Sequence, residues 1–383
     1  MKIHLSTPHM SGNEEKYIQQ AFDTNWVAPL GPNVDGFERD IKLFTGAKNA
    51  VALSSGTASI HMALKALKIK EGDKVFVSTL TFAATVNPII YEGAEPVFID
   101  SEPDTWNMSP IALAKAFEDC DELPKAVIVV HLYGHPAKMD KIMEICNYYN
   151  VPVIEDAAES LGATYDGVHT GTIGDLGIYS FNGNKLITTS GGGMMVSKDK
   201  SHSEYVRFLS TQAKENRPYY HHEETGYNYR LSNILAGIGR GQMEVIHERI
   251  QKKKEIFNLY RDAFSHNTNI EMLEPYSKSK PNYWLSCITL SDECDTEPQT
   301  VINKLAKHKV EARRVWKPMH LQPVFNKYKM YSHFNHDTET IAEDLFKRGI
   351  CLPSDTKLSL EDIYTVAALV NEFTKKTKEY IIF

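Results

Sequence analysis

The sequence predicts an α/β protein with a large domain built on a mainly parallel sheet and a smaller C-terminal α+β domain. Short apolar or β-branched runs alternate with helical segments as far as about residue 200, an alternation typical of βαβ units. After a long helical stretch, strands and amphipathic helices follow one another to the C-terminus. We therefore expect a large domain over residues 1–250 and a small domain over residues 251–383.

The large domain is expected to begin with two helices, over residues 12–22 and 34–44, joined by a rigid loop with two prolines, Thr24–Pro32. Loops of this kind often carry binding groups. The expected strands are then residues 50–53, 74–78, 96–99, 126–130, 151–155, 177–181 and 193–197. Ligands of such sheets bind beyond the carboxyl ends of the strands, so the residues that follow these runs are informative.

The last third of the chain is expected to begin with a helical stretch over residues 231–264, which links the two domains. A strand over residues 284–290 and amphipathic helices over residues 296–308 and 360–373 follow it.

Composition disfavours several classes of protein. The formal net charge of −7 argues against electrostatic binding to nucleic acid or to an anionic membrane. The N-terminal segment is interrupted by Pro8 and has become charged by Glu14, so no signal-peptide h-region is expected. No later apolar run is long enough to span a bilayer. The five cysteines form no C-x-x-C pair, so we expect no metal site. These features favour a cytoplasmic enzyme.

Small polar residues follow the first strand, in the run Ser54–Ala58, just before a helix. The N-terminus of a helix presents unpaired backbone N–H groups that can bind a phosphate. The run is neither G-x-x-x-x-G-K-[ST] nor G-x-G-x-x-G, so it does not support a nucleoside triphosphate or a dinucleotide. An ordinary helix N-cap explains it equally well.

Two other strands end at side chains suited to a planar cofactor. Asp156 could hold a protonated pyridine nitrogen, and a helix cap is the alternative reading. Glu159 would share a helix face with it. Phe82 could stack on the cofactor ring, although a core phenylalanine is the commoner explanation.

Lys185 lies in a polar bend between two apolar runs and precedes the glycines at 191–193. A lysine held between two strands suits Schiff-base formation, whereas a solvated hairpin lysine is the alternative. Each signal is weak alone. A phosphate cup, an aromatic plate, a strand-end acid and a Schiff-base lysine in this order together describe pyridoxal 5'-phosphate as the cofactor.

The motifs around these residues strongly resemble those of the DegT/StrS group, fold type I aminotransferases that act on nucleotide-linked keto-sugars. The resemblance runs from Leu5 to about Leu369. Its motifs are WVAPLGP at 26–32, SSGTA at 54–58, TFAAT at 81–85, EDAAE at 155–159, SFNGNK at 180–185, GYNYRLS at 226–232 and WKPMH at 316–320.

The resemblance implies a role for individual residues. Lys185 would be the Schiff-base lysine and Asp156 the partner of the pyridine nitrogen, and these two would be the catalytic residues. The other cofactor contacts would be Gly56, Thr57, Phe82, Glu159, Ser180 and, from the neighbouring subunit of a homodimer, Asn228. The nucleotide-sugar contacts would be Trp26, Val27, Ala28, Pro29, Leu30, Arg230, Trp316 and His320.

The resemblance also implies a reaction, in which L-glutamate donates an amino group to a nucleotide-linked 4-keto-6-deoxy sugar. The sequence around Lys185, with STQA at 210–213, is most similar to that of enzymes that aminate UDP-4-keto-6-deoxy-N-acetylglucosamine on the route to bacillosamine. Two departures are a serine and three glycines at 190–193, where the family often has a glutamate, and Glu159, where relatives often have Gln or His.

Several alternatives stay open at this point. One is amination of GDP-4-keto-6-deoxymannose or of a dTDP-3-keto sugar. Another is a regulatory protein that binds pyridoxal phosphate without turnover. A dinucleotide-dependent sugar dehydrogenase would need a glycine fingerprint that the chain lacks.

Overall fold

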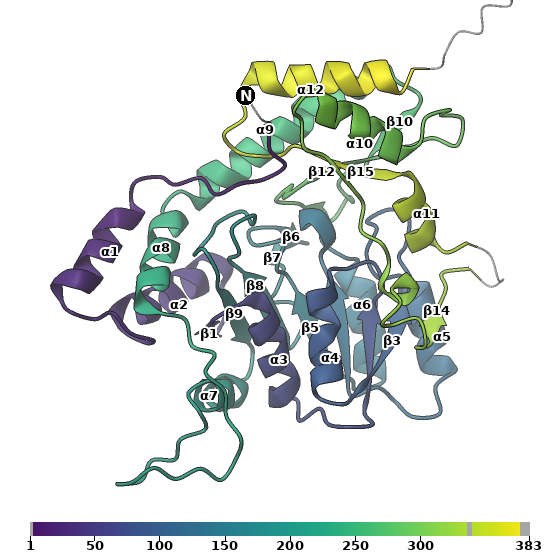
Figure 1. The fold of residues 1–383 in the computed structure, drawn as a ribbon. Coiled ribbons are helices and arrows are strands. Elements are labelled where there is room, and N and C mark those ends of the chain that lie inside the picture. Colours follow the sequence, from purple (N-terminus) through teal and green to yellow (C-terminus); the bar gives the residue numbers. More distant parts are fainter. Residues whose placement is uncertain (1–2, 335–338, 376–383) are drawn as a thin grey trace, which may run out of the picture.

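The largest sheet of the protein has eight strands in the order β1-β9-β8-β5-β4-β2-β3-β14, in a computed structural model that describes residues 3–334 and 339–375 (Figure 1). Its strands are β1 (Asn49–Leu53), β2 (Lys74–Ser78), β3 (Glu95–Ile99), β4 (Ala126–Val130), β5 (Val153–Asp156), β8 (Leu176–Ser180), β9 (Gly193–Ser197) and β14 (Met330–Tyr331). All neighbours from β8 to β14 pair in parallel, and only β9 runs antiparallel to its two neighbours. The predicted α/β class with a mainly parallel sheet is confirmed.

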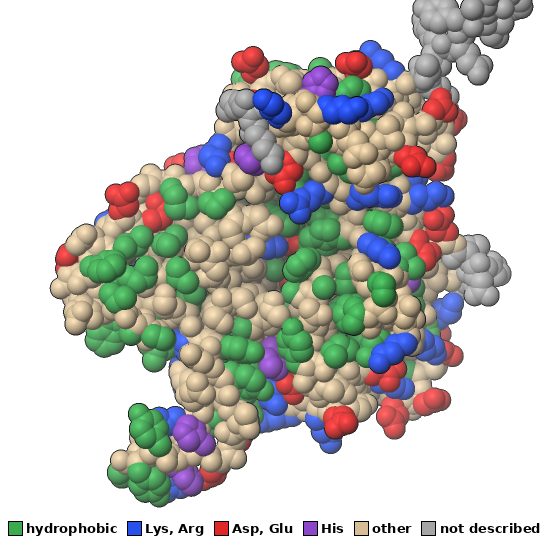
Figure 2. All heavy atoms as spheres, in the orientation of Figure 1, with side chains coloured by type: hydrophobic (Ala, Val, Ile, Leu, Met, Phe, Trp, Pro, Cys, Tyr) green, Lys and Arg blue, Asp and Glu red, His purple; other side chains and the backbone are tan. Residues whose placement is uncertain are grey.

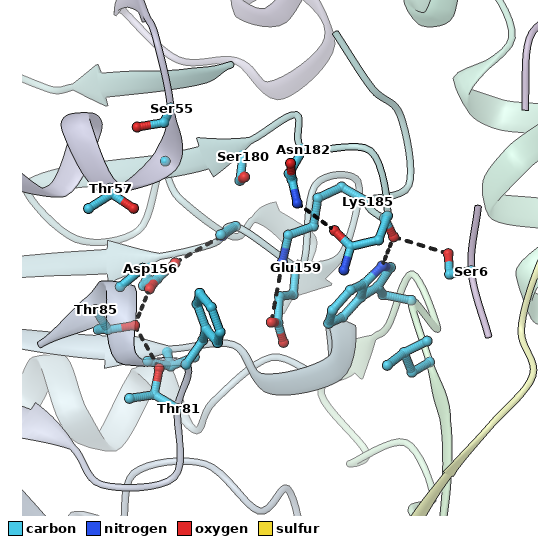
Figure 3. A pocket seen from close by; sticks show the side chains of 18 of the residues that line it. Ser6, Ser55, Thr57, Thr81, Thr85, Asp156, Glu159, Ser180, Asn182 and Lys185 are labelled. Carbon is cyan, nitrogen blue, oxygen red and sulfur yellow. Dashed lines mark hydrogen bonds and ion pairs between the residues drawn. The ribbon is translucent and has the colours of Figure 1, made fainter. Parts of the chain in front are cut away.

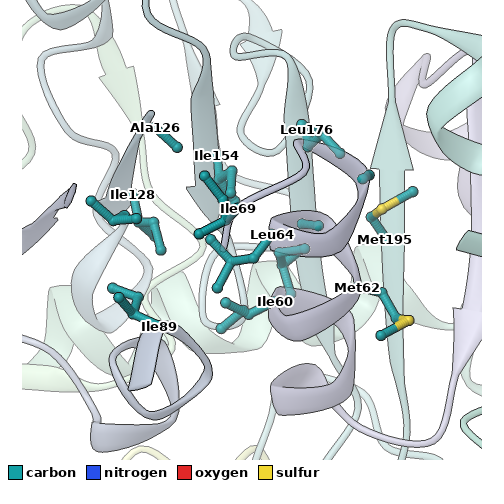
Figure 4. Packing of buried hydrophobic residues seen from close by; sticks show 14 of the residues in the cluster. Ile60, Met62, Leu64, Ile69, Ile89, Ala126, Ile128, Ile154, Leu176 and Met195 are labelled. Atoms are coloured by element: carbon teal, nitrogen blue, oxygen red, sulfur yellow. The ribbon is translucent and has the colours of Figure 1, made fainter. Parts of the chain in front are cut away.

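Helices cover both faces of this sheet. Successive residues of a strand point to opposite faces, so each face carries apolar side chains that a layer of helices buries. In β2, Val75 and Val77 pack in one core cluster, whereas Phe76 between them packs in another. Figure 4 shows the first cluster, in which Ile60 and Leu64 meet Ile128 and Ile154 of the sheet. The helices on one face include α3 (Gly56–Ala66) and α4 (Asn87–Tyr91), and those on the other include α5 (Pro110–Glu118) and α6 (Met139–Tyr148).

A second, antiparallel sheet in the C-terminal part has the strand order β10-β12-β15-β13. Its strands are β10 (Ile270–Met272), β12 (Ser286–Leu290), β13 (Arg313–Arg314) and β15 (Gly349–Leu352), and the helices of this part are α10 (Pro298–Lys307), α11 (Ile341–Arg348) and α12 (Leu360–Phe373). Side chains such as Ile288, Val301 and Val366 form its core. A sheet with segregated helices agrees with the α+β architecture predicted for this part.

The stretch 231–264, expected as one helical link, consists of two helices, α8 (Asn233–Met243) and α9 (Ile246–Phe264). Glycines of α8 face the neighbouring helices closely: a β-carbon on Gly241 would lie 2.6 Å from the backbone of Glu14. Because α8 packs this tightly on α1 (Glu14–Asp23) and α2 (Pro32–Thr45), the chain changes direction before α9 crosses to the second sheet (Figure 1).

A third sheet of three short strands connects distant parts of the chain, in the order β11-β6-β7. The remaining elements are β6 (Thr164–Tyr165), β7 (Val168–His169), β11 (Ser279–Lys280), α7 (Lys200–Leu209) and three single turns of 3-10 helix at Ala83–Thr85, Leu132–Gly134 and Met319–Leu321. A domain division at residue 250 remains a proposal, because α9 runs through it and β14 pairs with β3. Among the helices of the described residues, none is long and apolar enough to cross a membrane.

Candidate active site

A pocket lies beyond the carboxyl ends of β2, β4, β5 and β8, where sheets of this kind bind ligands (Figure 3). One wall comes from the strand ends and from the start of α3. The opposite wall comes from the C-terminal part, through Trp284, Leu285, Glu311, Arg313 and Trp316, and Leu5 and Ser6 of the N-terminal segment complete it. The pocket therefore lies between the two parts of the chain.

Asp156 ends β5 and is almost completely buried beside the pocket. Its Oδ2 accepts a hydrogen bond from Thr85 Oγ1 at 2.7 Å, and its Oδ1 accepts one from the backbone N–H of Ala158 at 3.1 Å. Thr85 Oγ1 lies 2.7 Å from Thr81 Oγ1, which continues this chain of hydrogen bonds. The carboxylate is thus held in one orientation, as a partner of a protonated ring nitrogen must be.

The N-terminus of α3 forms the second feature of the site. Ser55 Oγ caps the helix by accepting the N–H of Ala58 at 3.0 Å, so the N–H groups of Gly56 and Thr57 precede the first bonds within the helix. Gly56, Thr57 and Ser180 line the pocket together. A β-carbon on Gly56 would lie 3.0 Å from Ser180 Cβ, so the glycine leaves room beside the serine hydroxyl. This cradle fits a phosphate.

Lys185 lies in the connection between β8 and β9, the two strands that the apolar runs around it predicted, and these strands pair antiparallel. The lysine Nζ is 3.4 Å from Glu159 Oε1 and 4.1 Å from the ring centre of Trp284, and 14% of the side chain is exposed. This environment excludes the alternative of a solvated hairpin lysine.

The glycines after Lys185 have a structural partner that the sequence did not name. A β-carbon on Gly193 would overlap the carbonyl of Ser55, and one on Gly192 would overlap the hydroxyl of Thr189. Gly193 thereby lets β9 approach the residue that caps α3. Gly193 thus packs against the start of α3, whereas Gly191 and Gly192 line the pocket.

Glu159 is a second buried carboxyl group in the pocket, and its Oε2 accepts the backbone N–H of Tyr133 at 2.7 Å. Burial raises its pKa to about 7, although Lys185 beside it acts in the opposite direction. A group with this pKa can gain or lose a proton near neutral pH.

Phe82 lies at the pocket with a 60% exposed side chain, so it is not a core phenylalanine. The centre of its ring is 5.6 Å from that of Trp316, and both rings line the pocket. An exposed aromatic face in a pocket suits stacking on a planar ring.

Other predicted site residues lie away from the pocket of this chain. Asn228 is exposed and bridges to Thr211. Arg230 is buried and pairs with Glu38 Oε1 at 3.1 Å. His320 lies between Thr79 Oγ1, at 2.6 Å from its Nδ1, and Glu343 Oε1, at 3.2 Å from its Nε2.

The loop that contains Trp26, Val27, Ala28, Pro29 and Leu30 is largely exposed and is attached to the start of α8. Asn233 donates from its backbone N–H to Ala28 O at 2.9 Å and from Nδ2 to Trp26 O at 3.0 Å. Of the residues proposed for nucleotide-sugar binding, Trp316 alone belongs to the pocket lining of the described chain. The roles of the others remain predictions.

Several pocket residues were missed from the sequence. Thr85 falls within the TFAAT run, four residues after Thr81, and that spacing is a signal for a shared helical turn. Arg313, which pairs with Glu311 at 3.0 Å, lies just before the WKPMH motif. Trp284 carries no local signal, since only the fold brings it to Lys185. Within residues 3–334 and 339–375, no group of three His, Cys, Asp or Glu side chains could hold a metal ion.

An α/β fold with a strand-end carboxylate, a phosphate cradle at a helix N-terminus and a buried lysine defines an enzyme that uses pyridoxal phosphate. The chain belongs to the DegT/DnrJ/EryC1/StrS aminotransferase family, whose model matches residues 8–371. It is a pyridoxal phosphate-dependent aminotransferase of the sugar aminotransferase type.

Individual relatives agree with this assignment. EpsN of Bacillus subtilis (strain 168), whose name describes a pyridoxal phosphate-dependent aminotransferase, is 53% identical over 364 residues, which cover 94% of this chain and 93% of EpsN. GDP-perosamine synthase of Escherichia coli O157:H7 is 38% identical over 375 residues, 97% of this chain and 98% of that protein. The PLP form of Spr1654 from Streptococcus pneumoniae, named as a sugar aminotransferase, is 25% identical and superimposes with a TM-score of 0.88 over 98% of this chain and 100% of that one.

Proposed function

We propose that this enzyme transfers the amino group of L-glutamate to a nucleotide-linked 4-keto-6-deoxy sugar, giving a 4-amino sugar and 2-oxoglutarate. The observation that carries the proposal is the meeting of Lys185, Asp156 and the start of α3 in one pocket. The pocket also has a second wall from the C-terminal part of the chain, against which a substrate would lie.

The chain's own residues have distinct tasks in this proposal. Gly56, Thr57 and Ser180 would hold the phosphate of the cofactor, and Phe82 would lie against its ring. Asp156 would keep a proton on the ring nitrogen, because its carboxylate is fixed by Thr85 and Ala158. When bound, pyridoxal phosphate supplies the carbon that carries the amino group and a ring that stores the electron pair.

Lys185 would be the covalent attachment point of the cofactor and then the base that moves a proton at the reacting carbon. Glu159, 3.4 Å from the lysine Nζ, is placed to stabilise the ammonium form of Lys185. The aromatic wall of Trp284 limits the access of water to the same nitrogen.

The preferred substrate in this proposal is UDP-4-keto-6-deoxy-N-acetylglucosamine, the precursor on the route to bacillosamine. It is supported by the resemblance of the sequence around Lys185 and at residues 210–213 to that of enzymes that aminate this sugar. Residues 210–213 directly follow α7 and precede an exposed segment. A second candidate is GDP-4-keto-6-deoxymannose. The 38% identity to a protein named GDP-perosamine synthase favours a GDP-linked sugar.

We propose further that the enzyme acts in the cytoplasm as a homodimer with shared active sites. Hydrophobic side chains gather on the protruding segment after α7 and around α1 (Figure 2), and Phe22, Tyr219 and Tyr220 are among the exposed ones. A second subunit covering these surfaces would exclude them from water. Asn228 of the partner subunit would then reach the phosphate.

The test begins with the purified enzyme loaded with pyridoxal phosphate and converted by L-glutamate to its amine form, which removes the visible absorbance of the cofactor. UDP-4-keto-6-deoxy-N-acetylglucosamine, GDP-4-keto-6-deoxymannose and a dTDP-3-keto sugar are then added separately. Recovery of the absorbance with the UDP-linked sugar alone supports the proposal. Recovery with the GDP-linked sugar alone contradicts the UDP-linked substrate and supports GDP-4-keto-6-deoxymannose instead. Absence of a reaction with glutamate contradicts L-glutamate as the amino donor.

A further inference from the structure

Lys253, in the middle of α9, is completely buried at the junction between the two larger sheets. Its Nζ donates to Trp284 O at 2.9 Å, to Ser354 O at 2.6 Å and to Ser6 Oγ at 3.3 Å. These partners are two carbonyls and a hydroxyl rather than a carboxylate. Burial of an amine that has no carboxylate among its hydrogen-bond partners is costly, and burial lowers the pKa of Lys253 to about 7, although the nearby Asp355 carboxylate acts in the opposite direction. The partners of Lys253 therefore indicate what this buried amine holds in place.

Two of the three partners of Lys253 lead to the same atom, the backbone carbonyl of Asn184. Trp284 Nε1 donates to Asn184 O at 2.7 Å, and Ser6 Oγ donates to it at 3.0 Å. The hydrogen bonds therefore close a ring that runs from Lys253 through Ser6, Asn184 and Trp284 and back to Lys253. Figure 3 shows Ser6 beside the loop that carries Lys185.

Lys185 directly follows the residue that this ring holds. Its Nζ lies 4.1 Å from the centre of the Trp284 indole. The same hydrogen bonds therefore also fix the aromatic wall next to the amine. Three of the four members, Ser6, Asn184 and Trp284, line the pocket. Lys253 itself is excluded from the pocket lining and acts only through them.

The neighbouring turn of α9 provides an internal comparison. Arg249 donates from Nη2 to His9 O at 3.2 Å and contacts His9 Nδ1 at 2.9 Å, and neither residue lines the pocket. Arg249 thus attaches α9 to the N-terminal segment without reaching the site. Lys253 differs because its partners form the wall of the site.

We propose that Lys253 is a positioning residue, which holds the Asn184–Lys185 peptide and the Trp284 indole in the arrangement that Lys185 needs for proton transfer. The inference rests on the role proposed for Lys185. It assigns Lys253 to the chemical step rather than to substrate binding, because none of its hydrogen bonds points into the space that a substrate would fill.

The experiment compares Lys253→Met with Lys254→Met in the enzyme loaded with pyridoxal phosphate. Lys254 is the next residue of α9 and is exposed, so it is a matched control. Both variants are labelled with 5-fluorotryptophan, which reports on the four tryptophans, and the Trp284 signal is assigned by its loss in Trp284→Phe. The rate of the half-reaction with glutamate is measured per loaded site over a range of glutamate concentrations.

Two results are expected together for Lys253→Met. The fluorine resonance of Trp284 moves while that of Trp106 does not, and the limiting rate falls by about 10-fold with the half-saturating glutamate concentration changed by less than about 3-fold. Lys254→Met changes neither quantity. A purely structural lysine would lower the melting temperature but leave the rate per loaded site as in the wild type, and that outcome overturns the proposal, as does an unmoved Trp284 resonance.

If Lys253→Met fails to fold, Ser6→Ala combined with Trp284→Phe removes both donors to Asn184 O and leaves Lys253 in place. The same fall in limiting rate is expected, and a wild-type rate overturns the proposal. The test also separates this inference from the proposed function: a wild-type enzyme that does not react with glutamate contradicts the donor, whereas the Trp284 resonance reports on the position of the indole whatever the reaction.

Discussion

Gly193 of β9 lies directly against the backbone of Ser55, and a β-carbon at Gly193 would overlap the Ser55 carbonyl. Ser55 caps the helix whose first N–H groups form the phosphate cradle. The strand after Lys185 and the start of α3 are therefore packed without any intervening side chain. Through this contact the position of Gly193 is tied to that of the α3 N-terminus.

We expect Gly193→Ala to destabilise the protein by roughly 1–3 kcal/mol, because the added methyl group must displace the backbone around Ser55. The displacement would also weaken the binding of pyridoxal phosphate. Urea unfolding and titration with the cofactor measure the two effects. Gly191→Ala is the matched control for stability, because a β-carbon there meets nothing within 4 Å. Equal stability of the two variants would contradict the role given to Gly193.

Lys185→Ala is expected to keep the fold and to lose transamination completely, because no other lysine lines the pocket of the described chain. Borohydride reduction of the loaded enzyme followed by peptide mapping should place the pyridoxyl group on Lys185 in the wild type and on no residue in the variant. Lys254→Ala, an exposed lysine, should behave as the wild type. A pyridoxyl group found on a different lysine would reject the assignment.

Asp156→Asn is expected to lower the limiting rate by roughly 10²–10⁴-fold while the cofactor still binds, since the amide has nearly the same shape but cannot hold a proton on the ring nitrogen. Thr85→Val removes one hydrogen bond to Asp156 Oδ2 and should cost about 10-fold or less. Absorbance titration gives the cofactor occupancy, and stopped-flow mixing with glutamate gives the rate. An Asp156→Asn variant as fast as Thr85→Val would show that the charge is dispensable.

Glu159→Gln is expected to change how stability depends on pH. The folded-state pKa of Glu159 is raised from 4.5 to about 7, so its contribution to stability is fully present below pH 4.5 and is lost as the pH rises through 7. The glutamine variant carries no such loss. Its free energy of unfolding should therefore rise relative to that of the wild type over this interval, by an amount on the order of 3 kcal/mol.

The measurement for Glu159 is urea unfolding of the cofactor-free wild type, Glu159→Gln and the exposed control Glu144→Gln at pH 4.5 and at pH 7.5. Glu144 has a 74% exposed side chain, so its variant should follow the wild type at both values. Stability curves of wild type and Glu159→Gln that stay parallel would show that Glu159 does not have a raised pKa.

Most of the large sheet could be predicted from the sequence, because its strands are buried on both faces and read as continuous apolar runs. The runs over residues 74–78, 126–130 and 193–197 coincide with β2, β4 and β9. The two-residue strands β6, β7 and β14 were not predicted. Strands of two residues carry no periodic pattern, and their pairing is decided by distant partners such as β3.

The sequence by itself indicated the residues of the candidate site, since Asp156 ends a strand and Lys185, Phe82 and the run at Ser54 follow strands whose carboxyl ends lie at one edge of the sheet. Only the tertiary structure decided the opposite wall. Trp284 and Arg313 reach the pocket because the C-terminal part folds back over the sheet, a long-range contact that no local pattern encodes. The same holds for Lys253, which a helical pattern describes as one more lysine of a charged stretch and which packing buries against the carbonyl of Trp284.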